Sequence, residues 1–277
     1  MIIRQSFTIE GAEGRPILMD LHFKNGQEDR PIVLFVHGFK GFKDWGAYNL
    51  VAEYFVKQGF RFLKFNFSHN GTSPEKPTEF TDLGAFGDNT FSKEFFDLDQ
   101  VISFAKSGKD FPKSEKLYLI GHSRGGGTSI IQTAKDTRIN KLITWAAISD
   151  FRSLWKKEDE KEWRSKGVIF SFNTRTKQYT PLKIDLLHDL EKNVKAYDIL
   201  LAAQQIHKPW LIIHGDQDIN VSLDEALKLN ENCPQAELFT VPYANHVFGV
   251  SHPFTKDELS LELHLVCEKS VEFLKIS

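Results

Sequence analysis

The sequence feature that most constrains the fold is the motif Gly-His-Ser-Arg-Gly at residues 121–125. The four residues before it, Leu117–Ile120, are apolar or aromatic, as is typical of a buried parallel strand, and the residues after it can continue as a helix. A serine at such a strand-to-helix corner lies on a strained turn with its hydroxyl exposed, and the two glycines let the turn close without a Cβ clash. The motif therefore predicts an α/β sheet that presents Ser123 as a nucleophile.

Predicted strands and helices alternate along the first half of the chain. Alternating polar and apolar residues on both sides of residues 11–14 predict an antiparallel hairpin over residues 2–23 at the edge of a sheet. The elements that follow are predicted in the order strand 32–36, helix 48–58, strand 60–65, helix 91–106, strand 116–120, helix 128–135 and strand 141–147. This alternation predicts a mostly parallel sheet with helices on both faces, and ligands bind such sheets beyond the carboxyl ends of the strands.

The alternation is interrupted after Ala147. It resumes with a predicted strand at 209–214, a helix at 222–230, a strand at 236–241 and a closing helix. We therefore predict one core from residues 1–149 and 209–277, with residues 150–208 inserted as a cap over the active site. The aromatic side chains of this insertion are expected to supply an apolar pocket. A charge run at residues 156–162, with Trp155 and Trp163 beside it, is expected to form a solvated helix face.

A polar stretch in the insertion, Asn173–Thr176, leaves two interpretations open. It either orders the cap or contacts a carboxylate of the substrate. An exopeptidase would need a carboxylate or an arginine in the cap to bind a peptide terminus. The insertion offers four such candidates, which are Glu158, Glu162, Arg164 and Arg175.

The partners that a serine nucleophile needs are found further along the chain. An imidazole must take the hydroxyl proton, and a carboxylate must orient that imidazole. Asp216 and Asp218 follow the same predicted strand; we expect Asp216 to cap the turn and Asp218 to reach the site. His246 lies just past the last predicted strand, which gives the order Ser, Asp, His that this topology requires. His252 is expected on the loop surface, and His264 inside the closing helix.

The oxyanion formed during acyl transfer needs preorganised backbone donors. One predicted donor is the N–H of Arg124, the residue after the nucleophile. The other is predicted from the loop after the first parallel strand, His37–Gly41, in which the N–H of Phe39 is the candidate. Gly38 and Gly41 let this loop fold back towards the site.

Composition limits the possible partners and surroundings. The formal net charge of −2 over 277 residues favours neither nucleic acid nor an anionic membrane as a partner. The N-terminus shows no secretory signal, and two cysteines, Cys233 and Cys267, are too few for a disulfide framework, so we expect a cytoplasmic protein with reduced thiols. No Cys/His cluster has metal-ligand spacing and no nucleotide-binding loop is present, so neither a metal nor a cofactor is predicted. The sequence predicts no oligomeric state.

Taken together, these motifs resemble the α/β-hydrolase superfamily over nearly the whole chain. The resemblance rests on His37-Gly38-Phe39, on the Gly-His-Ser-Arg-Gly motif, on the loop that holds Asp218, and on Asn245-His246. Within the superfamily the chain is similar to serine esterases and peptidase-like hydrolases, the group around cinnamoyl and feruloyl esterases and dienelactone hydrolases. A serine nucleophile argues against dehalogenase, epoxide hydrolase and strict dienelactone hydrolase chemistry.

The resemblance implies the α/β-hydrolase fold and two-step acyl transfer through an acyl-enzyme, without a metal or cofactor. Ser123 would be the nucleophile, His246 the base and Asp218 its orienting acid, and the expected substrate is a small ester or a short peptide. Two alternatives stay open. The chain could be an aminopeptidase or acyl-peptide hydrolase, or a ligand receptor of the same fold that turns over slowly or not at all.

Overall fold

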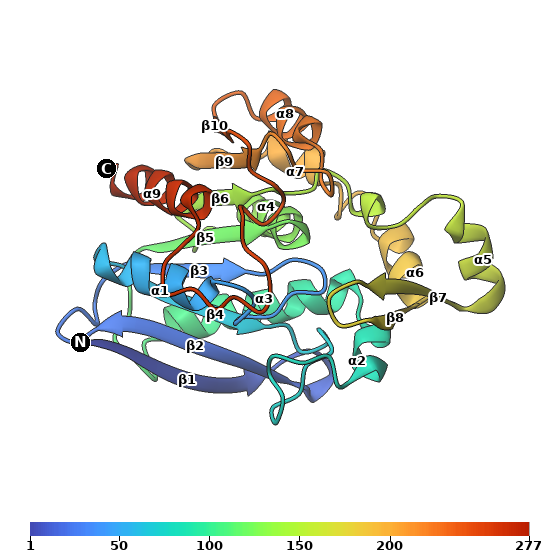
Figure 1. Ribbon diagram of the computed structural model, residues 1–277, viewed down its shortest axis with the longest axis horizontal. Helices are drawn as coiled ribbons and strands as arrows, with labels where there is room; N and C mark the ends of the chain where they lie inside the picture. Colours follow the sequence, from blue (N-terminus) through green and yellow to red (C-terminus); the bar gives the residue numbers. More distant parts are fainter. Residues whose placement is uncertain (277) are drawn as a thin grey trace.

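The computed structural model describes residues 1–276, and its centre is an eight-stranded sheet with the order β1-β2-β4-β3-β5-β6-β9-β10 (Figure 1). The strands are β1 (Ile2–Glu10), β2 (Pro16–Lys24), β3 (Ile32–Val36), β4 (Arg61–Asn66), β5 (Leu117–His122), β6 (Lys141–Trp145), β9 (Trp210–Gly215) and β10 (Glu237–Val241). β1 pairs antiparallel with β2, and β2 with β4, while the remaining pairs are parallel. The predicted edge hairpin and the mostly parallel sheet are confirmed.

The central strands are buried because their sequences are almost wholly apolar. Every residue of β3, β5 and β9 is buried, as expected for strands covered on both faces. After β3 the chain adds β4 on one side of it and then β5 on the other. Strand order therefore reverses beside β3, which places the loops after β3 and β5 at the edge where such sheets bind ligands.

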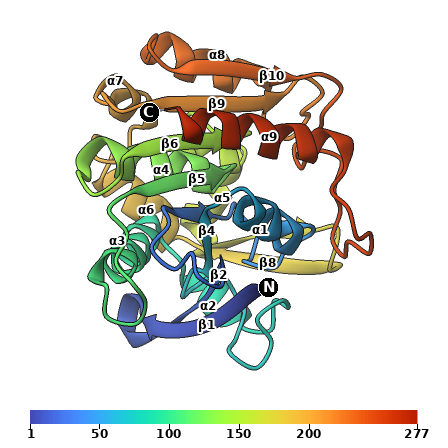
Figure 2. The same ribbon diagram turned by 90° about the vertical axis from the view of Figure 1, so that its left-hand side faces the viewer.

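Helices cover both faces of the sheet (Figure 2). One face packs against α1 (Tyr48–Lys57) and α9 (Leu261–Lys275). The other packs against α3 (Phe91–Ser107), α4 (Arg124–Lys135), α7 (Ile199–Gln204) and α8 (Leu223–Asn232). No helix among residues 1–276 is long and apolar enough to cross a bilayer.

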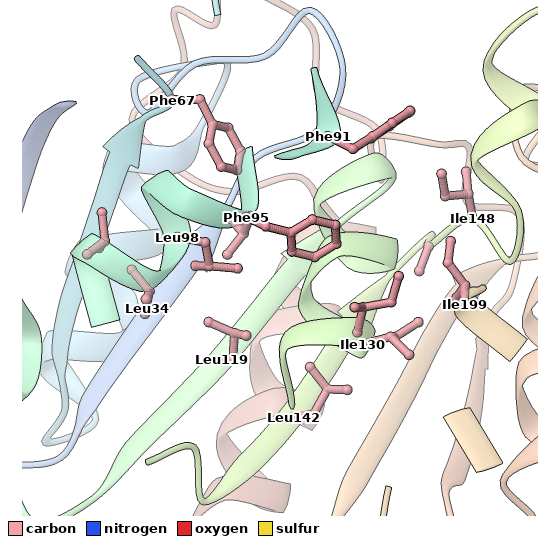
Figure 3. Close-up of a cluster of buried hydrophobic side chains, with 14 of the residues drawn as sticks. Leu34, Phe67, Phe91, Phe95, Leu98, Leu119, Ile130, Leu142, Ile148 and Ile199 are labelled. Atoms are coloured by element: carbon pink, nitrogen blue, oxygen red, sulfur yellow. The ribbon is translucent and has the colours of Figure 1, made fainter. Parts of the chain in front are cut away.

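The larger core cluster fixes α3 and α4 against the middle of the sheet (Figure 3). Leu98 of α3 and Ile130 of α4 are fully buried with Leu119 of β5 and Leu142 of β6. The Thr90 side chain accepts the Lys93 N–H and so begins α3. Because α4 starts directly after Ser123, this packing also anchors the serine.

Outside residues 150–208, two helices differ from the prediction. α4 begins at Arg124 and not at residue 128, because the intervening glycines lower helix propensity in the sequence but are needed for close packing. A Cβ at Gly126 would lie 2.4 Å from the Ala147 Cβ. The short helix α2 (Leu83–Asp88) was not predicted; the Asp82 side chain caps it by accepting the Ala85 N–H at 2.9 Å. The chain also has two 3₁₀ turns, Ala12–Gly14 between β1 and β2 and Phe151–Leu154 after β6.

Residues 150–208 contain a hairpin that was not predicted. The elements are α5 (Asp159–Lys166), β7 (Val168–Asn173), β8 (Gln178–Lys183), α6 (Asp185–Lys192) and α7, with β7 and β8 forming a separate antiparallel sheet. The hairpin and α5 project beyond the carboxyl ends of the parallel strands (Figure 1). The charge run does extend into the polar helix α5, as predicted.

Candidate active site

Ser123 lies at the corner between β5 and α4, with φ 55° and ψ −122°. A positive φ is strained for a residue that carries a side chain, and such strain clusters at functional sites. Close packing maintains it. A Cβ at Gly121 would lie 2.4 Å from the Gly125 carbonyl oxygen, and one at Gly125 would lie 2.4 Å from the Val36 carbonyl oxygen. Only glycine fits at either position of the motif.

His246 and Asp218 lie beside Ser123 although they are distant from it in sequence. His246 Nε2 is 3.0 Å from Ser123 Oγ, and His246 Nδ1 is 2.7 Å from Asp218 Oδ2. Asp218 follows β9 and His246 follows β10, so both reach the site from the carboxyl ends of neighbouring strands. The structure thus brings these three predicted side chains into one chain of hydrogen bonds.

Asp218 is a buried carboxylate with several donors around it. Its Oδ1 accepts the backbone N–H groups of Asn220 and Val221, each at 2.9 Å. Burial by itself raises the pKa of Asp218, but contacts from His214 and His246 outweigh burial and hold the pKa well below its usual range. A carboxylate at this position can accept a hydrogen bond from His246 Nδ1, and His246 Nε2 faces the Ser123 hydroxyl on the other side of the ring.

Asp216 occupies a different place. Its Oδ1 accepts the backbone N–H of Tyr243 at 2.6 Å, which ties the loop after β9 to the loop after β10. Asp216 therefore supports the turn, and Asp218 is the aspartate that contacts the imidazole.

His122 and Tyr48 also support the site and were not predicted from the sequence. His122 Nε2 lies 2.9 Å from the backbone carbonyl of His246, so this nitrogen carries the proton and donates it. The Tyr48 hydroxyl lies 3.4 Å from His122 Nδ1. Burial lowers the pKa of His122 to about 3, so the ring stays neutral and holds the His246 backbone without adding charge. The position of His122 inside the motif, next to Ser123, is the sequence signal from which its supporting role could have been predicted.

The loop after β3 lies against Ser123. A Cβ at Gly38 would lie 2.9 Å from the Ser123 Cβ. Within residues 1–276, the backbone N–H groups of Phe39 and Arg124 donate no hydrogen bond. The Arg124 side chain forms a buried ion pair with Glu94, and its guanidinium lies 4.8 Å from the centre of the Phe39 ring. Two unused amides therefore lie on the two segments that flank the serine.

A cavity of about 470 Å³ opens at Ser123 and His246. Its aromatic walls are Phe39, Trp45 and Tyr48, from the loop after β3 and the start of α1. The prediction that aromatic side chains of the insertion, such as those of Trp155 and Trp163, supply the pocket is wrong, because no aromatic side chain of residues 150–208 lines it. The Trp155 and Trp163 rings pack edge to face with centres 5.3 Å apart, and Trp163 is fully buried away from the cavity. The insertion contributes polar residues to the cavity instead, namely Asn173, Thr174 and Arg175.

His252 lines the same cavity, which corrects the expectation that it lies on a loop surface. The ring stacks on Trp45 with centres 6.0 Å apart, and Nδ1 accepts the backbone N–H of Gly46 at 2.9 Å. Burial lowers the pKa of His252. The histidine therefore orders the loop that carries Trp45.

The charged side chains that line the cavity are positively charged. Lys40 and Arg175 line it, and in the described part of the chain no aspartate or glutamate does. Burial, together with the nearby charge of Arg175, lowers the pKa of Lys40 to about 8.

Residues 1–276 contain no group of three or more His, Cys, Asp or Glu side chains arranged to hold a metal ion. Cys233 and Cys267 are free and buried, and burial raises the pKa of both thiols.

Residues 27–198 match the sequence profile of the family described as serine aminopeptidase, S33. No curated protein matches the sequence significantly. Among solved structures, Est1E from Butyrivibrio proteoclasticus with bound ferulic acid is 22% identical, with 97% of each chain covered and a TM-score of 0.75. The esterase domain of a Rhodothermus marinus protein is 18% identical, with 98% of this chain and 97% of that one covered and a TM-score of 0.64. The Pyrococcus furiosus esterase Pf2001 is 17% identical, with coverage of 99% and 91% and a TM-score of 0.65. The fold of the chain is the α/β-hydrolase fold.

Proposed function

The chain belongs to the serine aminopeptidase S33 family of hydrolases, and we propose that it is a serine carboxylesterase acting through an acyl-enzyme. The observation that carries the proposal is the hydrogen-bonded chain from Ser123 Oγ through His246 to Asp218, at 3.0 and 2.7 Å. These are the contacts that a nucleophile, a general base and its orienting acid require.

The proposed reaction begins when Ser123 Oγ attacks the ester carbonyl carbon. The Oγ–C bond forms as the hydroxyl proton passes to His246 Nε2, and the imidazolium is stabilised by Asp218. The tetrahedral intermediate collapses when the C–O bond to the alcohol breaks and the alcohol leaves with that proton. Water then gives a proton to the same imidazole and attacks the acyl-enzyme, which releases the acid and restores Ser123.

We assign the oxyanion of both intermediates to the backbone N–H groups of Phe39 and Arg124. Support comes from their lack of other acceptors within residues 1–276 and from the close approach of Gly38 to Ser123. The Arg124 amide also lies at the positive end of α4, which favours developing negative charge.

We also propose that residues 150–208 act as a cap on a core formed by residues 1–149 and 209–277. Two contacts support this assignment. Lys40 Nζ donates to Ser171 Oγ at 2.8 Å and to the Phe172 carbonyl at 3.0 Å, which fastens β7 to the loop after β3. The turn between β7 and β8 supplies part of the cavity wall.

An aminopeptidase is the second candidate, since the family is described by that activity. An aminopeptidase must bind the ammonium group of a peptide N-terminus, for which a carboxylate is the matching partner. Among the described residues none of the cavity-lining side chains is acidic, and Lys40 and Arg175 would repel an ammonium group. The charge of the cavity therefore favours the esterase.

The test is hydrolysis of a series of p-nitrophenyl esters, from acetate to long acyl chains, by the wild-type protein and Ser123→Ala. We expect turnover by the wild type and a loss of about 10⁴- to 10⁶-fold in the variant, with the fold intact by circular dichroism. A Ser123→Ala protein that keeps more than about a tenth of the rate would contradict the assigned nucleophile. Product limited to one equivalent would identify the slow-turnover receptor instead.

The two aspartates provide a matched control. Asp218→Asn should reduce kcat by about 10⁴-fold, because the imidazole loses the acceptor that fixes its tautomer. Asp216→Asn should cost far less, since the Asp216 side chain accepts a hydrogen bond only from the Tyr243 backbone N–H among the described residues. Equal losses in the two variants would show that the wrong aspartate has been assigned to His246.

A further inference from the structure

Lys40 and Arg175 are cations without counter-charges in the described chain. Both are half-buried in the wall of the cavity that holds Ser123, and no carboxylate of residues 1–276 lies within 4.0 Å of either. Arg124, just behind the same site, is instead paired with Glu94. Partial burial makes an uncompensated charge costly, so a partner is expected at Lys40 and Arg175.

Arg175 is held in place by aromatic rings and one backbone oxygen. Its guanidinium carbon lies 5.8 Å from the ring centre of Phe42, 5.6 Å from that of Trp45 and 5.8 Å from that of Phe80. Nη2 donates to the Lys40 carbonyl at 3.1 Å, while Nε is buried and has no partner in the described chain. These contacts hold the guanidinium in the cavity wall and leave hydrogen-bond donors unused among the described residues.

Asn173 adds a second, uncharged donor to the same wall. The residue is 5% exposed and lines the cavity. Its Oδ1 accepts the backbone N–H groups of Arg175 and Thr176, which fixes the orientation of the side-chain amide. Nδ2 is buried and, among residues 1–276, has no acceptor. An unpaired buried amide of this kind lacks a partner that a bound ligand can supply.

We propose that this wall is a subsite for a carboxylate carried by the substrate, so that the preferred esters are anionic at the end away from the scissile bond. Arg175 and Asn173 provide planar N–H donors for the carboxylate, and Lys40 adds a second positive charge. A guanidinium with unused donors is the side chain best matched to a planar carboxylate. This inference rests on the proposed esterase function and narrows its substrate class.

Two pairs of substrates test the subsite on either side of the ester bond. On the acyl side, mono-4-nitrophenyl glutarate is compared with 4-nitrophenyl pentanoate; on the alcohol side, 4-acetoxybenzoate is compared with 4-acetoxybenzamide. We expect kcat/KM to favour the anion by about tenfold or more in at least one pair, the scale of a charged hydrogen bond. A ratio near one in both pairs would overturn the proposal.

Two variants test whether Arg175 causes the preference for the anionic substrate. Arg175→Gln should bring the anion-to-neutral ratio down towards one, whereas Lys177→Gln, which removes a positive charge from an exposed position of the same turn, should leave the ratio unchanged. Equal effects of the two variants would mean that the preference arises from the general charge of the turn and would overturn the subsite.

A binding measurement separates this inference from the proposed function. Calorimetry with Ser123→Ala should show that, in at least one of the two pairs, the anion binds about tenfold more tightly than its neutral partner. This measurement needs no variant of Arg175. Ester hydrolysis by the wild type without this difference would refute the subsite and leave the esterase standing. Selective binding of the anion without any ester hydrolysis would refute the esterase and leave the anion subsite standing.

Discussion

Lys40 and Lys43 lie three residues apart in the loop after β3, yet their surroundings differ completely. Lys43 is buried in an ion network with Asp20 and Asp44, which also includes Lys64. Lys40 faces the cavity and donates only to the Ser171 hydroxyl and the Phe172 carbonyl among the described residues. One cation is compensated inside the protein and the other is not.

The difference separates a structural charge from one available for recognition. The paired network joins β2 and β4 to the loop after β3, and Lys64 is fully buried within it. Because each carboxylate contacts more than one cation there, the network has no capacity for a ligand. Lys40 and Arg175 have no such partners among the described residues and can bind one. The loop that carries Lys40 and Lys43 therefore stabilises the fold through Lys43 and lines the cavity through Lys40.

The largest expected effect is on stability and comes from breaking the ion network around Lys43. Asp44→Asn should lower the free energy of unfolding by about 3–5 kcal/mol, because it leaves Lys64 buried without its nearest carboxylate. Denaturant titration would measure this. Asp99→Asn removes a partly exposed partner of Arg138 and should cost less than about 1 kcal/mol. If Asp44→Asn were as mild as Asp99→Asn, the network would not stabilise the loop.

A smaller effect should follow when Lys40 and Arg175 are given a carboxylate from the protein itself. Thr174 lines the cavity beside Arg175, so Thr174→Glu places a carboxylate where we expect that of the substrate. The anion-to-neutral ratio of kcat/KM should fall by about tenfold, since the new side chain competes for the same cations. Thr174→Gln, of the same size but uncharged, is the control. A ratio that survives the glutamate would place the anion elsewhere.

The smallest effect should appear in the pH dependence. The pKa of Lys40 lies near 8, so Lys40 is charged below that pH and neutral above it. The anion-to-neutral ratio should therefore fall about two- to fivefold as pH rises through 8, the size of a partly exposed ion pair. Tyr48, His122 and His252 also line the cavity, but burial raises the pKa of Tyr48 and lowers the pKa of both histidines, so none of them changes charge near pH 8. Arg175 stays charged throughout, and His246 takes part in the reaction of both substrates of a pair. Lys40→Met should abolish the step; a step that persists in that variant belongs to another group.

The sheet could be predicted because its strands are apolar runs between turn residues, which only a covered parallel sheet accommodates. The β7–β8 hairpin could not. Its turn contains no glycine: Lys177 adopts a positive φ of 57°, and Asn173 accepts backbone N–H groups across the turn. No glycine or Asn-Gly signal therefore marks it in the sequence.

In the candidate site, the positions of Ser123, Asp218 and His246 follow from strand ends that the sequence reveals. The subsite does not. Arg175 reaches the Lys40 carbonyl across 135 residues, and no local pattern indicates that contact. The place of His252 in the cavity wall could not be predicted for the same reason, since its partners Trp45 and Gly46 lie in a distant loop.

The Arg124 side chain has a consequence for anyone who would rebuild this site in another protein. One guanidinium touches the Phe39 ring and is anchored by Glu94, so a single side chain sets the spacing between the two segments whose amides we assign to the oxyanion. The spacing therefore depends on α3, the helix on which Glu94 lies, although α3 contributes no lining residue to the cavity. A graft limited to the nucleophile, base and acid would lose this alignment; a working transplant must carry Glu94 and its helix as well.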